Sequence, residues 1–541
     1  MNILLEFSTL QYKNWHHMAK ELKAFYPGCR FAGLVNALPQ STEIVNFLKG
    51  QKDINYQFIH FLDDIRHKAF HAATEPDMEL LKSFEENSRY KSLWRFVAAD
   101  RNLGAVFMHG AVVRDTLANQ EQDPQRILGY FSNLLKEYKG VFESFRPDIF
   151  MPAIAMGAID AHILEQLCQQ SNTVYLAAYP CRIDDYFTFA ESSELEFSLI
   201  DCRYRQLLES TEEPQLTVAK RFYEKIISEL PAPKYFDRDN ECHRITRFLS
   251  VRERVVFWLK YIYTPLKVLK NWLKTRSLRR SPCYAKQPGT FKAFLSNLKY
   301  EWTRRAQEYR FLCKGAGEPL NRGQKYLYYP LHINPEYSTQ FLGTMWLDQI
   351  TVIEALAKSI PADWLVYVKE HPATLQNRVR PVGFYEKIKR LPNVKLINTF
   401  SDMHALVSNA QMVAVITGTS GWEAVQRGVP TINFGKCFWD VLKLSKRCTD
   451  LENLSLDIHD EIRRSSRIGD AERKRRLICY LAAVKECGFT ISDVQVFGNG
   501  AAGSEEQHQR VGRELAGAVH QYCLRRANTV QEDKEYEKVR S

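Results

Sequence analysis

Short apolar runs alternate with longer amphipathic stretches between residues 325 and 434, and this alternation constrains the fold more than any other feature of the chain. The runs have the length and composition of strands, and the stretches between them carry apolar residues at helical spacing. Such βαβ units form a parallel sheet with helices on both faces. The expected strands are residues 326–331, 364–368, 394–397, 412–416 and 429–434.

Three polar clusters follow strands of this expected sheet. They are His332-Ile333-Asn334-Pro335-Glu336, Lys369-Glu370-His371-Pro372 and the segment from Thr417 to Glu423. Ligands of such sheets bind beyond the carboxyl ends of the strands, so we expect the clusters to meet in one site. Histidine, lysine and hydroxyl groups beside glycines at a helix start are typical of an anion site, because free amides and the helix dipole favour negative charge. A single histidine at a strand end is more often structural, but the three clusters together favour binding.

This stretch resembles the capsule polysaccharide biosynthesis family. The resemblance is carried by Tyr329-Pro330-Leu331-His332 with Pro335-Glu336, by Val368-Lys369-Glu370-His371-Pro372, and by Thr417-Gly418-Thr419-Ser420-Gly421-Trp422-Glu423-Ala424. Better-known members are bacterial glycosyltransferases, including enzymes that transfer Kdo from CMP-Kdo, and their layout is similar to that of GT-B transferases. The resemblance therefore implies an α/β, GT-B-like fold in which two Rossmann-type domains face each other across a cleft.

The resemblance and the anion-site pattern together give a set of candidate nucleotide-binding residues. The set is His332, Asn334, Glu336, Lys369, His371, Pro372, Thr417, Gly418, Thr419, Ser420, Gly421 and Glu423. Pro372 forces a turn that holds the His371 imidazole at the strand end, where it can donate a hydrogen bond to a phosphate oxygen and assist departure of the nucleotide. Glu423 is expected in the first turn of its helix, where the resemblance implies binding of ribose hydroxyls. A carboxylate favoured by the helix dipole is the alternative there, and Glu336 has the alternative of a helix cap.

The first half of the chain shows the same alternation, with strands expected at residues 2–7, 31–35, 56–61, 105–108, 148–152 and 173–178. We therefore expect an N-terminal α/β domain at 1–235 for the acceptor and catalysis, and a nucleotide-sugar domain at 320–500. A basic helical insertion is expected at 242–314, and a C-terminal helix and tail at 504–541. A chain of 541 residues is long enough for two domains.

Arg182, Asp184 and Asp185 follow the strand expected at 173–178, so they are candidate catalytic residues. Arg182 would bind an acidic group, and either aspartate would act as base or nucleophile. The alternative is a turn with a solvated aspartate pair. Asp160 is expected to cap a helix. Glu6 and the pair at 63–64 are further carboxylates at strand ends and are less favoured.

The insertion at 242–314 contains 18 Lys and Arg and three Glu, a net charge of +15, so the rest of the chain carries −4. Apolar residues recur at helical spacing between its basic ones, which predicts an amphipathic helix broken near Pro265. One interpretation is docking on an anionic membrane surface, which suits a lipid-linked acceptor. The alternative is a helical insertion packed on the body. Nucleic-acid binding is not expected, because the apolar face is continuous rather than a set of isolated stacking aromatics.

Composition adds further expectations. The chain has no apolar stretch of membrane-spanning length, and the apolar run at its start contains Glu6, so we expect a strand there rather than a signal peptide. Twelve cysteines are scattered without a C-x-x-C pair, which favours reduced thiols in a cytoplasmic protein, peripheral to the inner membrane face if the insertion docks there. No D-x-D motif accompanies a strand in the second half, so neither a metal nor a cofactor is expected.

The sequence thus predicts a metal-independent glycosyltransferase of bacterial capsule or surface polysaccharide synthesis. Its donor would be a nucleotide-activated sugar, CMP-linked if the resemblance extends that far, and its acceptor a lipid-linked glycan or an oligosaccharide. Three alternatives stay open: a CDP-alditol phosphotransferase, a sugar-nucleotide epimerase or hydrolase, and a non-catalytic scaffold of polysaccharide assembly.

Overall fold

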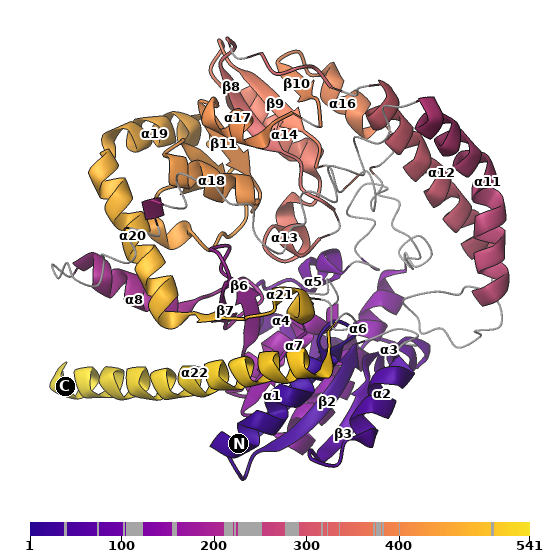
Figure 1. Cartoon of the computed structure of the whole chain (residues 1–541), viewed down its shortest axis with the longest axis vertical. Coiled ribbons are helices and arrows are strands. Elements are labelled where there is room, and N and C mark those ends of the chain that lie inside the picture. Colours follow the sequence, from indigo (N-terminus) through magenta and orange to yellow (C-terminus); the bar gives the residue numbers. More distant parts are fainter. Residues whose placement is uncertain are drawn as a thin grey trace.

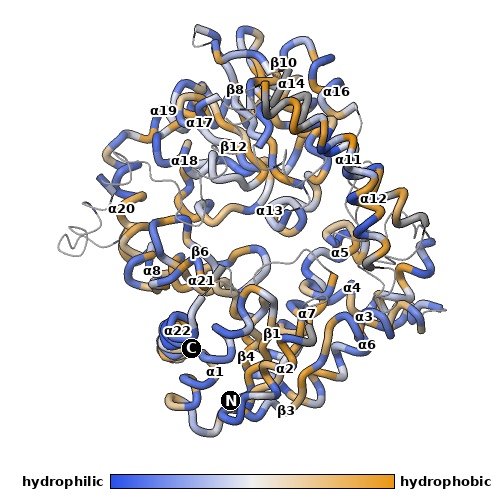
Figure 2. The backbone as a smooth tube through the Cα atoms, turned by 45° about the vertical axis from the view of Figure 1, so that its right-hand side comes forward, coloured by the Kyte–Doolittle hydropathy of each residue, from blue (hydrophilic) through white to orange (hydrophobic). Residues whose placement is uncertain are grey.

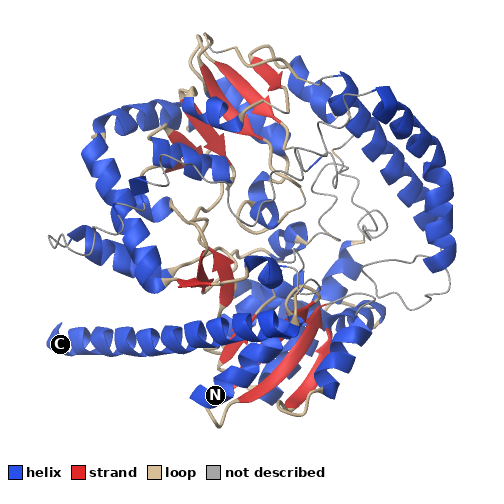
Figure 3. Ribbon diagram, in the orientation of Figure 1, coloured by secondary structure: helices blue, strands red, loops and turns tan. Residues whose placement is uncertain are grey.

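A computed structural model of the chain shows two α/β lobes (Figure 1). It describes residues 1–36, 41–72, 75–100, 103, 123–153, 159–209, 220, 223–224, 251–275, 291–314, 317–321, 323–334, 336–371, 374, 380, 383–399, 401–498 and 503–540. The first lobe holds the amino-terminal strands and the second holds the strands after residue 325 (Figure 3). The strand expected at 105–108 lies outside the described residues.

The first lobe is built on a parallel sheet with the order β3-β2-β1-β4-β5 in the described residues. Its strands are β1 (Asn2–Ser8), β2 (Arg30–Asn36), β3 (Tyr56–Phe61), β4 (Ile149–Met151) and β5 (Val174–Tyr175). The helices α1 (Tyr12–Phe25), α2 (Ser41–Gly50), α3 (Leu62–His71), α6 (Pro124–Phe145) and α7 (Ile159–Gln170) cover the sheet, and separate apolar cores fill its two faces. The strand order reverses between β1 and β4, which makes that position the switch point of the lobe.

The second lobe repeats this plan in a sheet with the order β10-β9-β8-β11-β12-β13. Its strands are β8 (Tyr326–Pro330), β9 (Leu365–Lys369), β10 (Val394–Ile397), β11 (Met412–Val415), β12 (Thr431–Asn433) and β13 (Lys446–Arg447). Its helices include α14 (Gln349–Ser359), α16 (Phe384–Arg390), α17 (Met403–Ser408), α18 (Thr419–Arg427) and α19 (Leu454–Arg467). Order 3-2-1-4-5-6 is that of a doubly wound nucleotide-binding sheet, with its switch point between β8 and β11. The predicted class, two Rossmann-type domains, is confirmed.

Local sequence signals explain the helix starts. Asp348 and Asp402 accept hydrogen bonds from the backbone N–H of Ile350 and His404 and so cap α14 and α17. Between β8 and β9, a short 3-10 turn (Thr344–Trp346) precedes α14, and the Asp348 cap starts the new helix. In the first lobe, the stretch between β3 and α6 includes α4 (Met78–Glu86), which the Asp77 side chain caps, and α5 (Leu93–Ala99).

The strand expected at 173–178 is divided in two. The Leu176 N–H still donates to the Phe150 carbonyl, and the chain then leaves the parallel sheet. It continues as β6 (Ala177–Pro180), which forms an antiparallel hairpin with β7 (Tyr186–Ala190). A third strand, β14 (Phe489–Thr490), adds to β7. This small sheet lies between the two lobes (Figure 3).

The last helix of the chain returns to the first lobe. After β14, the helix α22 (Glu505–Arg540) runs alongside α1 (Figure 1). Val511, Leu515 and Val519 are buried in the same core as Trp15 and Met18. A helix and a tail were expected at 504–541, and the helix continues to Arg540.

The helices α11 (Val251–Thr275) and α12 (Phe291–Lys314) form a hairpin at the edge of the molecule (Figure 1). Pro265 lies inside α11 without ending it, so the predicted break there is wrong. One proline costs about 3 kcal/mol in a helix interior, yet α11 continues through it and packs against α12. Residues 242–250 and 276–290 of the expected insertion lie outside the described residues. Among the described helices, none is both long and apolar enough to cross a membrane.

Candidate functional site

The switch point of the second lobe brings two of the three predicted clusters into contact. His332 follows β8 and Thr417 follows β11, and the Thr417 N–H donates to His332 Nε2 at 3.2 Å. A Cβ on Gly418 would lie 2.9 Å from the same nitrogen, so a glycine is needed for this close approach. Burial, reinforced by the nearby charges of His371 and Arg380, lowers the pKa of His332 to about 3. His332 is therefore a neutral, buried imidazole that holds the start of the 417–421 loop.

A buried ion pair, which the sequence did not indicate, fixes the end of β9. Glu370 is fully buried, and Arg380 donates to its two carboxylate oxygens at 2.8 and 2.7 Å. The Tyr385 hydroxyl donates to Glu370 at 2.7 Å, and Arg380 also donates to the His332 carbonyl at 2.8 Å. Burial raises the pKa of Glu370, but the charge and hydrogen bonds of Arg380 outweigh it and hold that pKa below its ordinary value. The ion-pair partner of Glu370 is therefore Arg380, ten residues further along the chain.

His371 and Lys369 lie beside this pair. Lys369 is buried at the last position of β9. Burial lowers the pKa of His371 to about 4, Glu370 opposes that shift, and the charges of Lys369 and Arg380 add to it. At neutral pH His371 is therefore an uncharged donor or acceptor, and Lys369 supplies the positive charge. Pro372, which was expected to form the turn after His371, lies outside the described residues.

Within the segment 417–421, Thr417 and Gly418 lead directly into α18, which begins at Thr419. Gly418 occupies the N-cap, Thr419 is the exposed first residue, and the first N–H groups of any helix lack intrahelical partners. The Thr417 hydroxyl donates to the Ser338 carbonyl, and the Ser420 hydroxyl lies 3.4 Å from the Met403 sulfur.

Gly421 was expected to admit a phosphate, and the structure gives it a packing role. A Cβ there would lie 2.6 Å from Val415 and 3.0 Å from Trp439. The glycine is therefore needed because α18 packs closely on β11.

Glu423 lies beyond the first turn of α18, so the prediction that placed it in that turn is wrong. The alternative, a carboxylate favoured by the helix dipole at the first turn, is wrong for the same reason. Its Oε1 accepts from Arg427 Nη2 at 2.7 Å and contacts His404 Nδ1. These two side chains hold the carboxylate on the side of α18 that faces α17.

Asn334 and Glu336 have local structural partners. Asn334 donates to the Leu347 carbonyl at 2.9 Å and accepts from the Thr339 hydroxyl at 3.2 Å. Glu336 caps the short helix α13 (Tyr337–Gln340), with Thr339 as the reciprocal partner. The cap alternative for Glu336 is therefore the one that the structure shows.

Arg182, Asp184 and Asp185 do not lie at the strand end where they were expected from the sequence. They lie in the turn between β6 and β7, not at the carboxyl end of a parallel strand. Arg182 and Asp184 have φ angles of 61° and 44°, and the Arg182 guanidinium lies 3.4 Å from the Tyr179 hydroxyl. Asp184 is exposed. The alternative interpretation of these residues was a turn, and a turn is what the structure shows. The catalytic role of Arg182, Asp184 and Asp185 stays a prediction.

A pocket between the lobes contains a carboxyl group that the sequence ranked low. Glu6, near the end of β1, lines it together with Asn36 and Ala153, and the wall from the second lobe is Tyr337 and Phe341. Asn36 Nδ2 donates to one Glu6 oxygen at 2.6 Å, and the Ala153 N–H donates to the other at 3.0 Å. Burial raises the pKa of Glu6 to about 7, although Asn36 and Ala153 act in the opposite direction. This pocket occupies the switch point of the first lobe.

Arg66 lies behind this pocket. It donates to Asp160 at 3.0 and 2.8 Å and to Asp63 at 3.1 Å, and a longer contact of 3.4 Å reaches Asn36 Oδ1. The prediction that Asp160 caps its helix is wrong, because it is buried in this ion pair. Asp100 caps α7 instead, by accepting from the Ile159 N–H at 2.8 Å.

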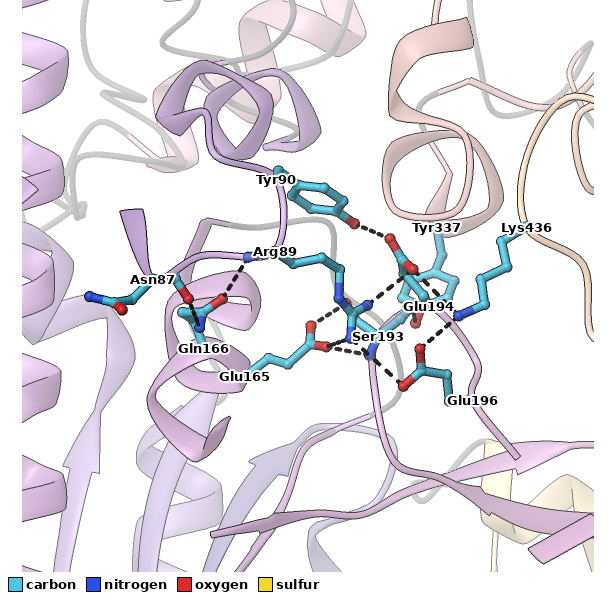
Figure 4. Close-up of polar contacts among 10 residues, drawn as sticks. All are labelled: Asn87, Arg89, Tyr90, Glu165, Gln166, Ser193, Glu194, Glu196, Tyr337 and Lys436. Carbon is cyan, nitrogen blue, oxygen red and sulfur yellow. Dashed lines mark hydrogen bonds and ion pairs between the residues drawn. The ribbon is translucent and has the colours of Figure 1, made fainter. Parts of the chain in front are cut away.

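An ion network joins the lobes beside the pocket (Figure 4). Lys436, from the second lobe, lies 2.7 Å from Glu196 and 3.5 Å from Glu194, both in the loop after β7. Arg89 of the first lobe approaches Glu194 at 3.1 Å and Glu165 at 3.6 Å. Burial raises the pKa of Glu196, but Lys436 and Arg89 outweigh it and lower that pKa. The network therefore consists of charged groups that face each other across the interface.

Helix α13 packs against the first lobe beside this network. The Tyr337 hydroxyl donates to the Ser193 carbonyl (Figure 4), and the Phe341 ring stacks on His162 with centroids 4.2 Å apart. Because α13 directly follows the His332 loop, it connects the switch point of one lobe to that of the other.

One family model matches part of the chain. Residues 282–473 match the family model described as capsule polysaccharide biosynthesis protein, which confirms the resemblance over the second lobe. No curated protein sequence matches the chain.

The solved structures that match are distant. One is the beta Kdo 2,4 transferase KpsC of Thermosulfurimonas dismutans, at 13% identity over 58% of this chain and 78% of that chain, with a TM-score of 0.29. Another is the UDP-GlcNAc 2-epimerase of Neisseria meningitidis, at 10% identity over 90% and 98%, with a TM-score of 0.25. The fold assignment rests instead on the strand order of the two sheets.

Proposed function

We propose that this protein is a glycosyltransferase of capsule or related surface polysaccharide synthesis, which transfers a sugar from a nucleotide-activated donor to a glycan acceptor. The observation that carries the proposal is the second-lobe switch point, where the family match coincides with the convergence of His332, Lys369 and the start of α18. Switch points of doubly wound sheets are where nucleotides bind, and a helix start there favours phosphate.

The donor is held by groups whose charge states suit an anion. The first N–H groups of α18 and the Thr419 hydroxyl donate to the phosphate, and Lys369 supplies the charge that neutral His371 lacks. His371 donates a hydrogen bond to the departing nucleotide. Glu423, whose Oε1 is anchored by Arg427, accepts from the ribose hydroxyls through Oε2. The donor that the family resemblance favours is CMP-linked.

The helix α11 supports a lipid-linked acceptor at an anionic membrane surface. One face of α11 is apolar and exposed, with Ile262 67% and Leu266 59% accessible. The exposed side chains at helical spacing are Val251, Val255, Trp258, Leu259, Ile262, Leu266, Leu269 and Leu273. Lys260, Lys267 and Lys270 are exposed on the same helix. Figure 2 shows this mixture of apolar and polar positions along the hairpin at the periphery of the molecule. Such a helix lies in a headgroup layer, with basic residues attracted to anionic lipid.

Nucleotide binding is the first test. Thermal unfolding is followed with CMP, CDP, UDP or GDP, for the wild type, for His371→Ala and for the control His459→Ala, an exposed histidine of α19 in the same lobe. A nucleotide at about 100 times its Kd stabilises by about 2.7 kcal/mol. We expect a shift with CMP in the wild type and control, and a smaller shift in His371→Ala. A shift in none of them contradicts the nucleotide site.

Product analysis then separates the competing activities. Release of CMP together with a lengthened acceptor supports glycosyl transfer. CMP release with a phosphate-linked alditol product indicates a phosphotransferase, and a changed sugar nucleotide without acceptor indicates an epimerase or hydrolase.

A further inference from the structure

The pocket at the first-lobe switch point has the form of a second binding site. Its walls come from both lobes, and most of them are apolar or aromatic, including Tyr175 and Tyr179. Its carboxylate and amide side chains are Glu6, Asn36 and Asp160, which direct hydrogen bonds and Arg66 link to one another. The cavity is about 30 Å³, which is room for a hydroxyl group but not for a whole sugar, so only the reacting end of a ligand would enter it. Because α13 forms one wall and also borders the 417–421 loop, the pocket adjoins the proposed donor site.

A chain of hydrogen bonds orients Glu6 in this pocket. The guanidinium of Arg66 contacts Asn36 Oδ1, so the amide of Asn36 is turned with its Nδ2 towards Glu6. The Ala153 N–H fixes the other Glu6 oxygen. Each carboxylate oxygen can accept more than one hydrogen bond, so the two contacts leave acceptor capacity for a ligand hydroxyl.

Glu6 and Glu370 differ in their ion-pair partners and in the direction of their pKa shifts. Both glutamates are buried near the carboxyl end of a parallel strand, Glu6 on β1 and Glu370 directly after β9. Glu370 is neutralised by two direct bonds from Arg380, and its pKa is held low. Among the described residues no cation forms an ion pair with Glu6, because Arg66 binds Asp160 and Asp63 instead. Burial raises the pKa of Glu6 to about 7, although the charge of Arg66 acts in the opposite direction. A carboxyl group that titrates near neutral pH is suited to accept a proton during catalysis.

We propose that Glu6 is the catalytic base of the transfer, acting on an acceptor hydroxyl bound in the pocket between the lobes. The inference rests on the proposed glycosyltransferase function. The acceptor O–H bond breaks and its proton moves to a Glu6 oxygen. The acceptor oxygen bonds to the anomeric carbon of the donor sugar, and the bond from that carbon to the phosphate oxygen breaks. Its electron pair leaves with the nucleotide phosphate, which the second lobe holds.

The test compares wild type, Glu6→Gln and the control Glu143→Gln, an exposed glutamate on α6 of the same lobe. CMP release from CMP-Kdo is measured with a Kdo-terminated oligosaccharide acceptor. We expect Glu6→Gln to lower kcat by about 10²- to 10⁴-fold while the thermal shift with CMP is unchanged, and the control to retain full activity. A folded Glu6→Gln that still binds CMP and keeps kcat within about threefold of wild type overturns the proposal.

A second measurement does not depend on that variant folding. A base must be deprotonated, so wild-type kcat should fall as the pH drops below an inflection near 7. Asn36→Ala removes a donor that favours the Glu6 carboxylate, so the inflection should move to higher pH. An inflection that stays in place overturns the base assignment. Absence of any transfer by the wild type overturns the glycosyltransferase proposal and this inference together, whereas an active wild type with an unaffected Glu6→Gln overturns only the inference.

Discussion

Removing the guanidinium of Arg380 should destabilise the second lobe more than any surface substitution. Arg380 and Glu370 have 4% and 0% of their side chains exposed, so solvent cannot replace the lost partner. Arg380→Leu deletes both bonds to Glu370 and the bond to the His332 carbonyl. Breaking a buried ion pair from one side typically costs about 3–5 kcal/mol, because the other charge stays buried.

The loss should depend on pH in a defined direction. In the wild type the folded-state pKa of Glu370 is lowered, so its contribution is present above the unfolded-state pKa and disappears as the pH falls through the folded-state value. In Arg380→Leu burial is no longer opposed by the guanidinium, and that pKa should rise. Protonation at mildly acid pH then relieves the buried charge. The difference between the two proteins should therefore be largest near neutral pH and shrink towards acid.

Urea unfolding followed by tryptophan fluorescence measures this effect at several pH values. Arg390→Leu, an exposed arginine on α16, is the matched control and should change stability by no more than about 0.5 kcal/mol. The double variant with Glu370→Leu should recover much of the loss, because no charge then remains buried. A loss below about 1 kcal/mol, or one independent of pH, would refute the assignment of this pair.

Three further predictions follow from particular contacts. Gly418→Ala places a methyl group 2.9 Å from His332 Nε2, so the loop must shift, and titration calorimetry should show CMP affinity reduced at least tenfold. The double variant Ile262→Asp with Leu266→Asp should abolish flotation of the protein with phosphatidylglycerol vesicles. The control Leu456→Asp, which replaces an equally exposed leucine on α19, should leave flotation unchanged. Equal flotation of the two variants contradicts membrane docking. Lys436→Met should lower unfolding free energy by less than about 1 kcal/mol, because its partner Glu196 is 43% exposed, and a thermal-unfolding loss of several kcal/mol would contradict this.

The periodic part of the fold could be predicted from sequence, because apolar strands and capped helices repeat at short range. The second-lobe strands and the Asp402 cap follow directly from such local patterns. The β6–β7 hairpin was missed, because an apolar run does not show where a chain leaves one sheet to pair with another. A helix break was predicted at Pro265 from local propensity alone, and local propensity does not include the packing of α11 against α12.

The candidate site was predictable only where its parts lie in strand ends. His332 and Thr417 were found because each follows a strand, and their contact confirms the convergence. Arg380 gave no signal, since an arginine in a loop carries no periodicity. The importance of Glu6 depends on Asn36 and Ala153, which lie 30 and 147 residues away and become partners only in the folded sheet.

Because α22 packs on α1, the core of the first lobe cannot be completed until α22 has been synthesised. The apolar face of α1, with Trp15 and Met18, is synthesised well before Val511 and Leu515, which cover part of it. At about 5–20 residues per second, a ribosome needs roughly 25–100 s to bridge that interval. The second lobe can therefore complete its core during translation while the first waits with an open surface. Chaperone dependence in the cell should accordingly be traced to α1, and a circular permutant that places α22 directly before α1 should fold with less assistance.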